Sequence, residues 1–358
     1  MLHLLLLVFR PYGFYHGAQA QIHAYTQTEE PMPGPEKVRI CMIGAGSLAN
    51  AMHYPSLSEM EDVEIAGTCD LDAERLQNTA ARFNIANTYS DYREMLDKEK
   101  PDGVYCLMPP HHLYDISINV LQRGHHLFVE KPPGLNAFQT SSMAKTAAKY
   151  GALTMTAFNR RFIPLMRDVR AQVEARGPII QFQSVFHKHQ FTTPGDLPYY
   201  GGATDILSCD AVHAVDVCRW LGGGEVSAVA SDVREVYADY PNVFNALIKF
   251  DNGCAGFLQA NWVAGTRRHI FEIHGKGITA YIDPDDTARV YTDGNDEPAV
   301  LDVNTAAGND ARYHAYGFFG ENRHFIDCIK TGRQTDTNFT DATKTMELVD
   351  SIYHSVLE

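Results

Sequence analysis

The alternation of short apolar runs with amphipathic stretches, which begins at Val38, constrains the fold more than any other feature of this chain. "VRICMIGAG" is typical of a buried strand that runs into glycines, and "AERLQNTAARF" carries its apolar residues at helical spacing. The alternation continues through "DGVYCLMPP", "HHLFVEKPP" and "LTMTAFN", with short connections between the runs. Strands that alternate with helices in this way predict a doubly wound parallel sheet of α/β type.

The texture of the sequence changes after about residue 160, where longer runs with partial alternation take over. One of them, "NALIKFDNGCAGFLQA", contains a hairpin signal at Asp251-Asn252-Gly253. This half predicts an α+β domain with an open, largely antiparallel sheet. Because single cores usually split beyond ~250–300 residues, the chain of 358 residues is expected to hold two domains. We place them at residues 37–158 and 159–358, after a leader of residues 1–36.

The composition argues against several classes of protein. A formal net charge of −14, without runs of like charge, argues against a nucleic-acid-binding surface. No apolar stretch is long enough to span a membrane, and the seven cysteines are scattered singly, which favours a reducing, cytoplasmic compartment. Residues 1–36 are predicted to be a disordered or signal-like leader that ends in a linker. Export is the alternative if residues 1–20 act as a signal peptide.

A glycine-rich turn follows the first strand and opens a helix. "IGAGSLANAMH" gives Gly44-x-Gly46-x-x-Ala49, in which the first glycine allows a tight turn and the second lets the backbone approach a pyrophosphate. The small side chain of Ala49 permits close packing of the helix on the strand. The helix that begins near Ser47 and Leu48 offers free N–H groups to the phosphates. The motif therefore predicts a dinucleotide-binding Rossmann domain.

The choice of dinucleotide is predicted from Asp70, which ends the next strand. A carboxylate at this position can accept hydrogen bonds from the diol of the adenine ribose, and it would repel a 2′-phosphate. No arginine directly follows Asp70 to offset that repulsion. NAD is therefore the predicted cofactor, with NADP as the alternative.

The chain resembles the Gfo/Idh/MocA family of NAD(P)-dependent oxidoreductases over roughly residues 37 to 358. The resemblance rests on "IGAGSLANAMHYPSL", "CDLDAERL", "LMPPHHLYDISINVLQRGHHLFVEKPP", "GGATDILSCDAVHAVDVCRWLGG" and the closing "FIDCIKTGRQTDTNFTDATKTMELVDSIYHS". It implies hydride transfer between a nicotinamide and a secondary alcohol of a sugar, cyclitol or related polyol. It also implies cofactor contacts by Pro109, Pro110 and His111, and closure over the nicotinamide ribose by Glu130 and Lys131.

Lys131 follows a buried-strand pattern and precedes two prolines in "LFVEKPPGL". It lies where open α/β sheets bind their ligands, at the carboxyl end of a strand, and the prolines stiffen the chain that follows. A solvated charge pair on a loop is the plain alternative. The family resemblance favours a lysine held beside the hydride-transfer centre.

"CDAVHAVDVCRW" places Asp210, His213 and Asp216 at successive spacings of three, which suggests one helix face. A carboxylate one turn from a histidine can orient the imidazole and raise its pKa. By resemblance His213 is the catalytic histidine, and Asp210 is our candidate for its partner. The position where the family usually has its aspartate, four residues before the histidine, holds Cys209, and "GGATDILSC" is one residue longer than usual. Asp216 is expected to stabilise the helix or to support a residue of the site from behind.

The substrate is expected to lie in the cleft between the two domains. Asn159 and Arg160 follow the last strand of the first domain and are predicted to contact the substrate. Another residue of "NRR" is expected to form a structural ion pair. Tyr199 and Tyr200 are predicted to stack on a sugar ring, with core packing as the alternative. The histidines occur as adjacent pairs or without a third ligand, so no metal site is predicted.

Two classes of function stay open at this point. In the enzyme, His213 would exchange the hydroxyl proton and Lys131 would stabilise negative charge on the same oxygen. The swapped assignment makes Lys131 the proton carrier. The other class is a catalytically silent NAD(P)-binding sensor, because one fold can serve many functions. The presence of both side chains favours the enzyme, and the open sheet of the second domain predicts a homo-oligomer.

Overall fold

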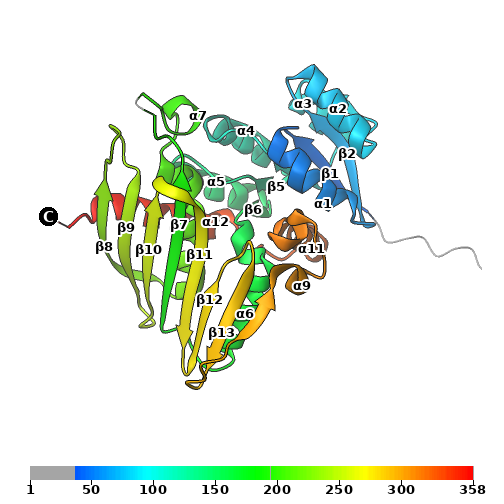
Figure 1. The fold of residues 1–358 in the computed structure, drawn as a ribbon. Coiled ribbons are helices and arrows are strands. Elements are labelled where there is room, and N and C mark those ends of the chain that lie inside the picture. The colour runs from blue at the N-terminus through cyan, green and yellow to red at the C-terminus, as the bar shows by residue number, and fades with distance from the viewer. Residues whose placement is uncertain (1–36, 194, 358) are drawn as a thin grey trace, which may run out of the picture. The chain divides into compact units, whose positions relative to one another are not determined.

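The computed structural model of the protein describes residues 37–193 and 195–357 (Figure 1). The predicted leader of residues 1–36 lies outside the described residues. Within the described part, helices that combine the length and the apolar character needed to cross a membrane are not found.

A six-stranded parallel sheet forms the first half, which confirms the predicted doubly wound fold. Its strand order is β3-β2-β1-β4-β5-β6, and every recorded pairing is parallel. The order changes direction between β1 and β4, so the carboxyl ends of these strands form the switch point where such sheets bind ligands. The strands are β1 (Val38–Ile43), β2 (Val63–Cys69), β3 (Thr88–Tyr89), β4 (Gly103–Cys106), β5 (His126–Val129) and β6 (Thr154–Thr156).

Helices cover both faces of this sheet, because its strands are apolar on both faces. Val104 and Leu127 belong to one buried cluster, whereas the next residues along the same strands, Tyr105 and Phe128, belong to another. Side-chain caps start three helices, with Asp72, Asp91 and Asn136 accepting backbone N–H groups. The helical segments are η1 (Ala49–His53), α1 (Tyr54–Ser58), α2 (Ala73–Phe83), α3 (Tyr92–Glu99), α4 (Pro110–Gln122) and α5 (Ala137–Tyr150).

An eight-stranded sheet forms the second half, and its pairings are antiparallel except for the parallel pair β7–β10. This confirms the predicted open, largely antiparallel sheet. Its order is β14-β13-β12-β11-β7-β10-β9-β8. The strands are β7 (Gln181–His189), β8 (Val226–Arg234), β9 (Val243–Phe250), β10 (Ala255–Asn261), β11 (Val263–Gly275), β12 (Ile278–Ile282), β13 (Thr287–Thr292) and β14 (Ala299–Asp302).

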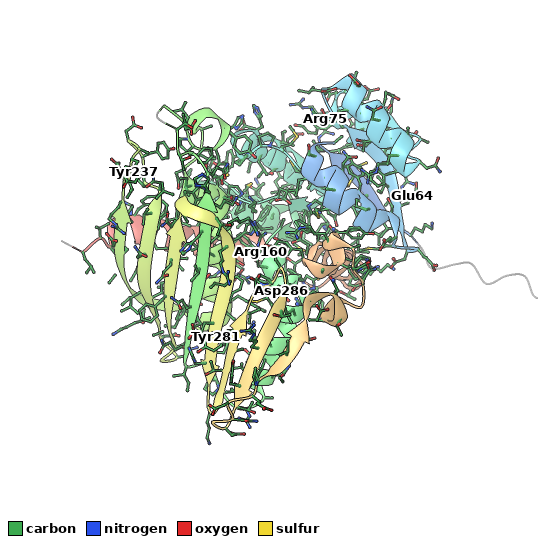
Figure 2. The ribbon with its side chains drawn as sticks, in the orientation of Figure 1. Glu64, Arg75, Arg160, Tyr237, Tyr281 and Asp286 are labelled. Carbon is green, nitrogen blue, oxygen red and sulfur yellow. The ribbon has the colours of Figure 1, made fainter. Side chains whose placement is uncertain are left out.

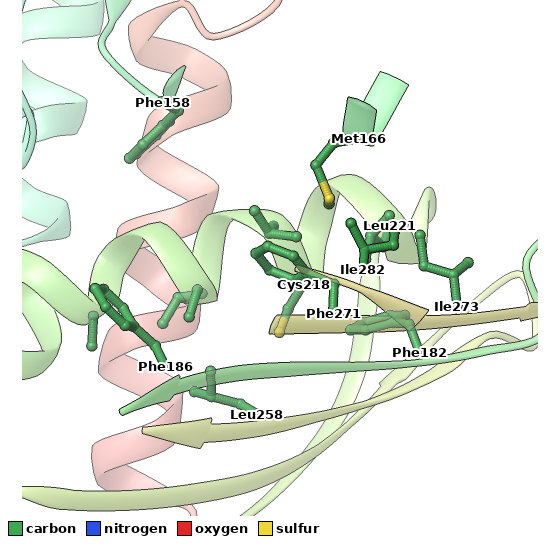
Figure 3. Packing of buried hydrophobic residues seen from close by; sticks show 14 of the residues in the cluster. Phe158, Met166, Phe182, Phe186, Cys218, Leu221, Leu258, Phe271, Ile273 and Ile282 are labelled. Atoms are coloured by element: carbon green, nitrogen blue, oxygen red, sulfur yellow. The ribbon is translucent and has the colours of Figure 1, made fainter. Parts of the chain in front are cut away.

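One face of this second sheet is covered by helices, and α8 lies across its centre. Cys218 and Leu221 of α8 and Phe182 and Leu258 of the strands share one buried core (Figure 3). The helical segments of this half are η2 (Asn159–Phe162), α6 (Pro164–Glu174), α7 (Tyr199–Gly202), η3 (Leu207–Ala211), α8 (Val212–Gly222), α9 (Val303–Ala307), α10 (Arg312–Ala315), α11 (Phe318–Thr331) and α12 (Phe339–His354).

The last two helices pack on the first sheet rather than only on the second. Phe325 of α11 stands edge-on to Tyr105 and Phe128, with ring centroids 5.5 Å and 5.7 Å apart. Phe339 of α12 is fully buried in the cluster on the opposite face of that sheet. The parallel sheet therefore takes part of its core from residues after 317. The predicted domain boundary at residue 158 stays a prediction.

Candidate active site

The glycine turn at the end of β1 has the backbone that a bound dinucleotide requires. Gly44 has φ of +109°, and a Cβ there would lie 2.5 Å from the carbonyl oxygen of Leu107, so this position demands glycine. A Cβ on Gly46 would meet nothing within 4 Å, so the backbone is open to a ligand. Both glycines line a cavity of about 580 Å³. These residues fit a pyrophosphate, whereas a turn built only for packing would fill the space at Gly46.

The other residues predicted for the cofactor are distributed around this turn. Ala49 is buried and packs in the core beneath it. Ser47 and Leu48 are exposed at the start of the helix, and Leu48 also lines a second, smaller cavity nearby. Pro109 lines the 580 Å³ cavity, as does His112. His111 instead packs its ring on that of Tyr200, with centroids 5.6 Å apart.

Asp70 lines the same cavity, and its carboxylate is already engaged. It accepts the N–H of Ala45 at 2.8 Å and that of Asp72 at 2.9 Å, and Nη2 of Arg75 donates to it at 2.8 Å. Burial alone would raise the pKa of Asp70, but the bond from Arg75 and the two backbone N–H groups lower it. No arginine directly follows Asp70 in the sequence, but Arg75, in the first turn of α2, contacts its carboxylate. Arg75 is labelled in Figure 2.

A second cavity, of about 250 Å³, borders the helical segment after the glycine turn through Leu48 and Met52. Its lining brings together residues that are up to about 270 positions apart in the chain: Leu48, Met52, Glu130, Lys131, Asn159, Arg160, Asp210, His213, Arg267, Arg312, Tyr316 and Phe318. All three predicted catalytic residues belong to this set. We call this the substrate-side cavity, because the predicted substrate residues Asn159 and Arg160 line it.

Lys131 and Asp210 are paired in the substrate-side cavity. The ammonium of Lys131 donates to the carbonyl oxygen of Cys209 at 3.3 Å and lies 3.5 Å from Asp210 Oδ1. Asp210 also accepts from Lys188 and, at 2.6 Å, from the hydroxyl of Tyr199. Burial would raise the pKa of Asp210, but Lys131 and Lys188 hold it well below its usual range. Burial opposes the charge of Lys131, yet Asp210 raises its pKa on balance, so Lys131 stays an ammonium.

His213 is buried and takes its hydrogen bond from Arg160 rather than from a carboxylate. Arg160 Nη1 lies 2.9 Å from His213 Nε2, while Nδ1 of the ring has no partner among the described residues. Burial, Arg160 and Lys131 lower the pKa of His213 well below its usual value. The prediction that Asp210 raises this pKa is therefore wrong, because cations surround the ring and Asp210 is taken by two lysines and a tyrosine.

The prediction that Asp210, His213 and Asp216 share one helix face is also wrong. Each step of three residues falls about 60° short of a full α-helical turn, so two steps rotate the side chain by about 120°. Asp210 also lies in the wider π-helical turn η3, so its side chain departs further from the α-helical spacing. Asp210 and His213 line the substrate-side cavity, whereas Asp216 is not part of its lining and binds Arg161.

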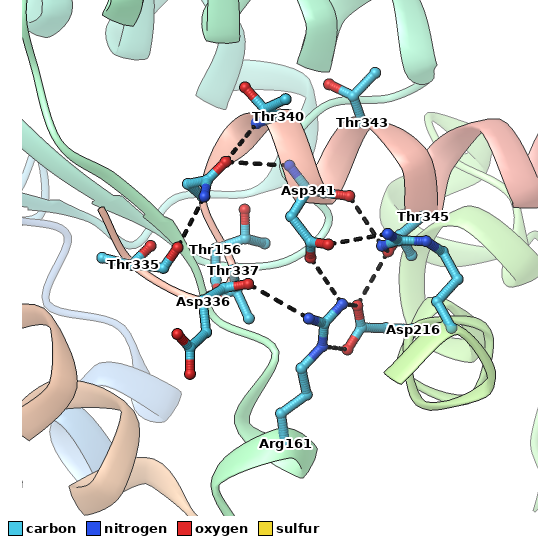
Figure 4. A network of polar contacts seen from close by, with 12 residues as sticks. Thr156, Arg161, Asp216, Thr335, Asp336, Thr337, Thr340, Asp341, Thr343 and Thr345 are labelled. Atoms are coloured by element: carbon cyan, nitrogen blue, oxygen red, sulfur yellow. Dashed lines mark hydrogen bonds and ion pairs between the residues drawn. The ribbon is translucent and has the colours of Figure 1, made fainter. Parts of the chain in front are cut away.

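Asp216 belongs to a buried ionic network behind the site (Figure 4). Arg161 donates to its two oxygens at 2.7 Å and 2.5 Å, and Thr345 donates to it at 3.0 Å. Asp341 of α12 lies 2.8 Å from the same guanidinium. Arg161 therefore makes the structural ion pair that was expected within "NRR". Asn159 donates to the carbonyl oxygen of Tyr316 and accepts from Arg160.

Glu130 is held by a histidine that the sequence did not single out. Its Oε1 lies 2.9 Å from Nε2 of the fully buried His53, and its Oε2 accepts the backbone N–H of Lys131 at 3.0 Å. The opposite ring nitrogen of His53 lies 3.2 Å from Asn322. The carboxylate of Glu130 thus fixes the backbone that presents Lys131.

Several residues of the site went unnoticed in the sequence. Lys188 lies between His187 and His189 on β7, so strand alternation turns it to the opposite face, toward Asp210. Of the two tyrosines predicted to stack on a sugar ring, Tyr199 donates its hydroxyl to Asp210, and Tyr200 is half exposed. Arg267, Arg312 and Tyr316 reach the cavity from distant segments without a local signal. Metal-binding groups of three or more side chains are not found within the described residues.

Comparison with known proteins identifies the class of this chain. Residues 38–158 match the model of the oxidoreductase family with an NAD-binding Rossmann fold, and residues 171–280 match the GFO/IDH/MocA C-terminal domain. The chain therefore belongs to the Gfo/Idh/MocA family of oxidoreductases, and its first half is an NAD-binding Rossmann domain, as predicted.

Particular relatives cover nearly the whole chain. The scyllo-inositol 2-dehydrogenase (NAD⁺) of Bacillus subtilis is 23% identical over 87% of this chain and 92% of its own. The D-apiose dehydrogenase of Paraburkholderia graminis is 24% identical over 88% and 87%. Among solved structures, levoglucosan dehydrogenase in complex with NADH and levoglucosan has a TM-score of 0.78 at 20% identity, covering 89% of this chain and 97% of its own. That last similarity concerns the fold.

Proposed function

We propose that this oxidoreductase transfers a hydride between NAD and a secondary alcohol of a sugar, cyclitol or related polyol. The observation that carries the proposal is the meeting of Lys131, from the end of β5, with His213, from α8, in one cavity next to the glycine turn. Relatives named as scyllo-inositol and D-apiose dehydrogenases support this substrate class. A silent sensor would not need a protonated lysine and a neutral histidine in the same cavity.

The electrostatics of the cavity favour His213 over Lys131 as the group that exchanges the proton. In the oxidation of an alcohol, the carbon loses a hydride and the hydroxyl loses a proton, which leaves a ketone. His213 is a neutral imidazole at neutral pH and can take that proton at Nε2 once Arg160 releases the nitrogen. Lys131 remains an ammonium and can donate a hydrogen bond to the same oxygen, stabilising its growing negative charge. The swapped assignment would require Lys131 to lose its proton.

NAD, when bound, would supply the hydride acceptor or donor for this reaction. Gly44 and Gly46 would hold its pyrophosphate through their backbone, and Asp70 would accept hydrogen bonds from its adenine ribose. We infer a preference for NAD over NADP, because the carboxylate of Asp70 and a 2′-phosphate repel each other. NADP use would require Arg75 to turn from Asp70 to the phosphate.

The proposal is tested by a substrate panel. The protein would be incubated with NAD and a series of cyclitols, pentoses, hexoses and sugar acids, and NADH formation would be followed by absorbance. We expect turnover with at least one compound and loss of turnover in His213→Asn. Tight NADH binding without turnover of any compound in either direction would overturn the proposal and favour the sensor.

We also propose that copies of this chain associate through the exposed face of the second sheet. We further propose that the protein resides in a reducing compartment. Phe257, Tyr281 and Val300 are exposed large apolar residues on three of its strands. All seven cysteines are buried and unpaired, as in a cytoplasmic protein. Light scattering behind size exclusion would measure the assembly, and a monomeric mass at micromolar concentration would contradict it.

A further inference from the structure

Three arginines gather around one tyrosine in the substrate-side cavity. The guanidinium carbons of Arg160 and Arg312 lie 4.9 Å and 4.5 Å from the centre of the Tyr316 ring. Arg267 donates from Nη2 to the Tyr316 hydroxyl at 2.8 Å. All four residues line the cavity, together with Lys131. We call Arg160, Arg267 and Arg312 the arginine cluster.

The arginine cluster has fewer carboxylates than guanidinium groups. Asp285 serves two of the three, because it pairs with Arg267 at 2.6 Å and with Arg312 at 2.9 Å. Arg160 forms no ion pair within residues 37–193 and 195–357, and its recorded hydrogen bonds go to Asn159 and His213. Its Nε is buried and has no partner there. A buried charge without a counter-charge is costly, so Arg160 is suited to a negatively charged ligand.

The other carboxylates near Arg160 are paired with other residues or are buried where their charged form is disfavoured. Glu130 binds His53, and Asp210 binds Lys131 and Lys188. Glu321 is fully buried, and its two oxygens have no partner among the described residues. Burial and the neighbouring Glu130 raise its pKa well above the usual value, so the surroundings of Glu321 disfavour its charged form. The cavity therefore presents an excess of positive charge.

We propose that the substrate supplies the missing charge: it is a sugar or polyol that carries an acid group, and this group binds Arg160 and its neighbours in the arginine cluster. The inference rests on the proposed dehydrogenase function and narrows its substrate class to uronates, aldonates or sugar phosphates. Guanidinium groups bind carboxylate and phosphate through paired hydrogen bonds. An acid group that engages Arg160 also competes with the bond from Arg160 to His213 Nε2. Binding would thereby free the nitrogen that accepts the proton.

Matched pairs of sugars test this on the unmodified protein. D-glucuronate would be compared with D-glucose, and D-galacturonate with D-galactose, by calorimetry in the presence of NADH and by kcat/KM with NAD. We expect the acid to bind about 10- to 100-fold more tightly, and the difference to shrink as salt is added. D-glucose 6-phosphate, run in parallel, distinguishes phosphate from carboxylate. Equal or tighter binding of the neutral sugars would overturn the inference.

Variants at the rim of the cluster provide the second test. Arg267→Gln and Arg312→Gln should lower the acid-to-neutral ratio of kcat/KM about tenfold or more. Arg176→Gln is the matched control, because Arg176 also pairs with an aspartate, Asp293, but lies outside the cavity. An unchanged ratio in both cluster variants would overturn the inference while leaving the dehydrogenase intact. Turnover of neutral sugars only would also overturn the inference and leave the proposed dehydrogenase function intact. If nothing is turned over, the proposed function fails, and calorimetry still decides whether the cavity selects anions.

Discussion

Arg160, labelled in Figure 2, and Arg161, shown with its partners in Figure 4, are neighbours in the chain and similarly buried, yet their surroundings differ in charge. Arg161 binds both oxygens of Asp216 and also contacts Asp341, so its charge is fully compensated. Arg160 contacts an asparagine and a histidine, and it borders the cavity. Arg161 therefore ties η2 to α8 and α12.

The difference shows how one short segment can serve both stability and binding. Breaking a buried, compensated ion pair leaves an uncompensated charge in the protein, so Arg161 is expected to matter for folding. A buried guanidinium that lacks a carboxylate keeps its capacity to bind an anion, so Arg160 is expected to matter for the substrate and for His213. Four predictions test this separation between the paired network and the cavity.

The largest effect is expected at His213, on the cavity side. His213→Asn should lower kcat by about 10²–10⁴-fold, because it removes the group proposed to accept the proton. NAD affinity should hardly change, because the glycine turn and Asp70 are in the other half of the chain. Steady-state kinetics and calorimetry measure the two quantities. If the variant keeps most of its activity while Lys131→Met loses it, the swapped assignment is correct.

Asp216 is the test on the side of the paired network. Asp216→Asn should lower the free energy of unfolding by about 3 kcal/mol, because Arg161 would lose its two-bond partner in a buried place. Urea denaturation followed by fluorescence gives the value. The matched control is Asp97→Asn, since Asp97 also pairs with an arginine, Arg123, but is largely exposed. We expect less than ~1 kcal/mol there, and similar losses for both variants would contradict the distinction.

Arg75 is paired with Asp70, so replacing Asp70 would leave this arginine without its carboxylate partner. Wild type should bind NADH more tightly than NADPH. Asp70→Ala should remove that preference and improve NADPH binding about tenfold, because Arg75 would then be free to bind a 2′-phosphate. Fluorescence titration with both cofactors measures this. Adding Arg75→Gln to the same variant should cancel the gain, and a gain that persists would exclude the role of Arg75.

The smallest effect concerns pH. His213 must be neutral to accept a proton, and its pKa is lowered, so alcohol oxidation should stay active at pH values below the usual histidine pKa of about 6.5. The profile of kcat/KM should rise with pH through an ionisation below that value and be flat above it, until other groups titrate. Arg160→Gln should move this ionisation upward, because it removes a nearby positive charge. A wild-type ionisation above 6.5 would contradict the surroundings described for His213.

The sequence by itself determined the architecture and the cofactor half of the site. Alternating strand and helix patterns specify the parallel sheet, because each pattern depends on neighbours a few positions away. The requirements at Gly44 and Gly46 are local as well, since they arise from the turn between one strand and one helix. The Asp caps of the helices and the hairpin at residues 251–253 are also local, because each depends on residues only a few positions apart.

Only the tertiary structure decided which charges meet. The spacing of Asp210, His213 and Asp216 suggested one face, but the accumulated helical rotation and the π-helical turn separated their partners. Nothing in "NRR" distinguishes Arg160 from Arg161, because Asp216 and Asp341 lie 55 and 180 positions from Arg161. The pKa of His213 depends on burial, on Arg160 of η2 and on Lys131, which follows β5. Periodicity determines the face of an element, whereas desolvation and charge pairing depend on what that face meets across the fold.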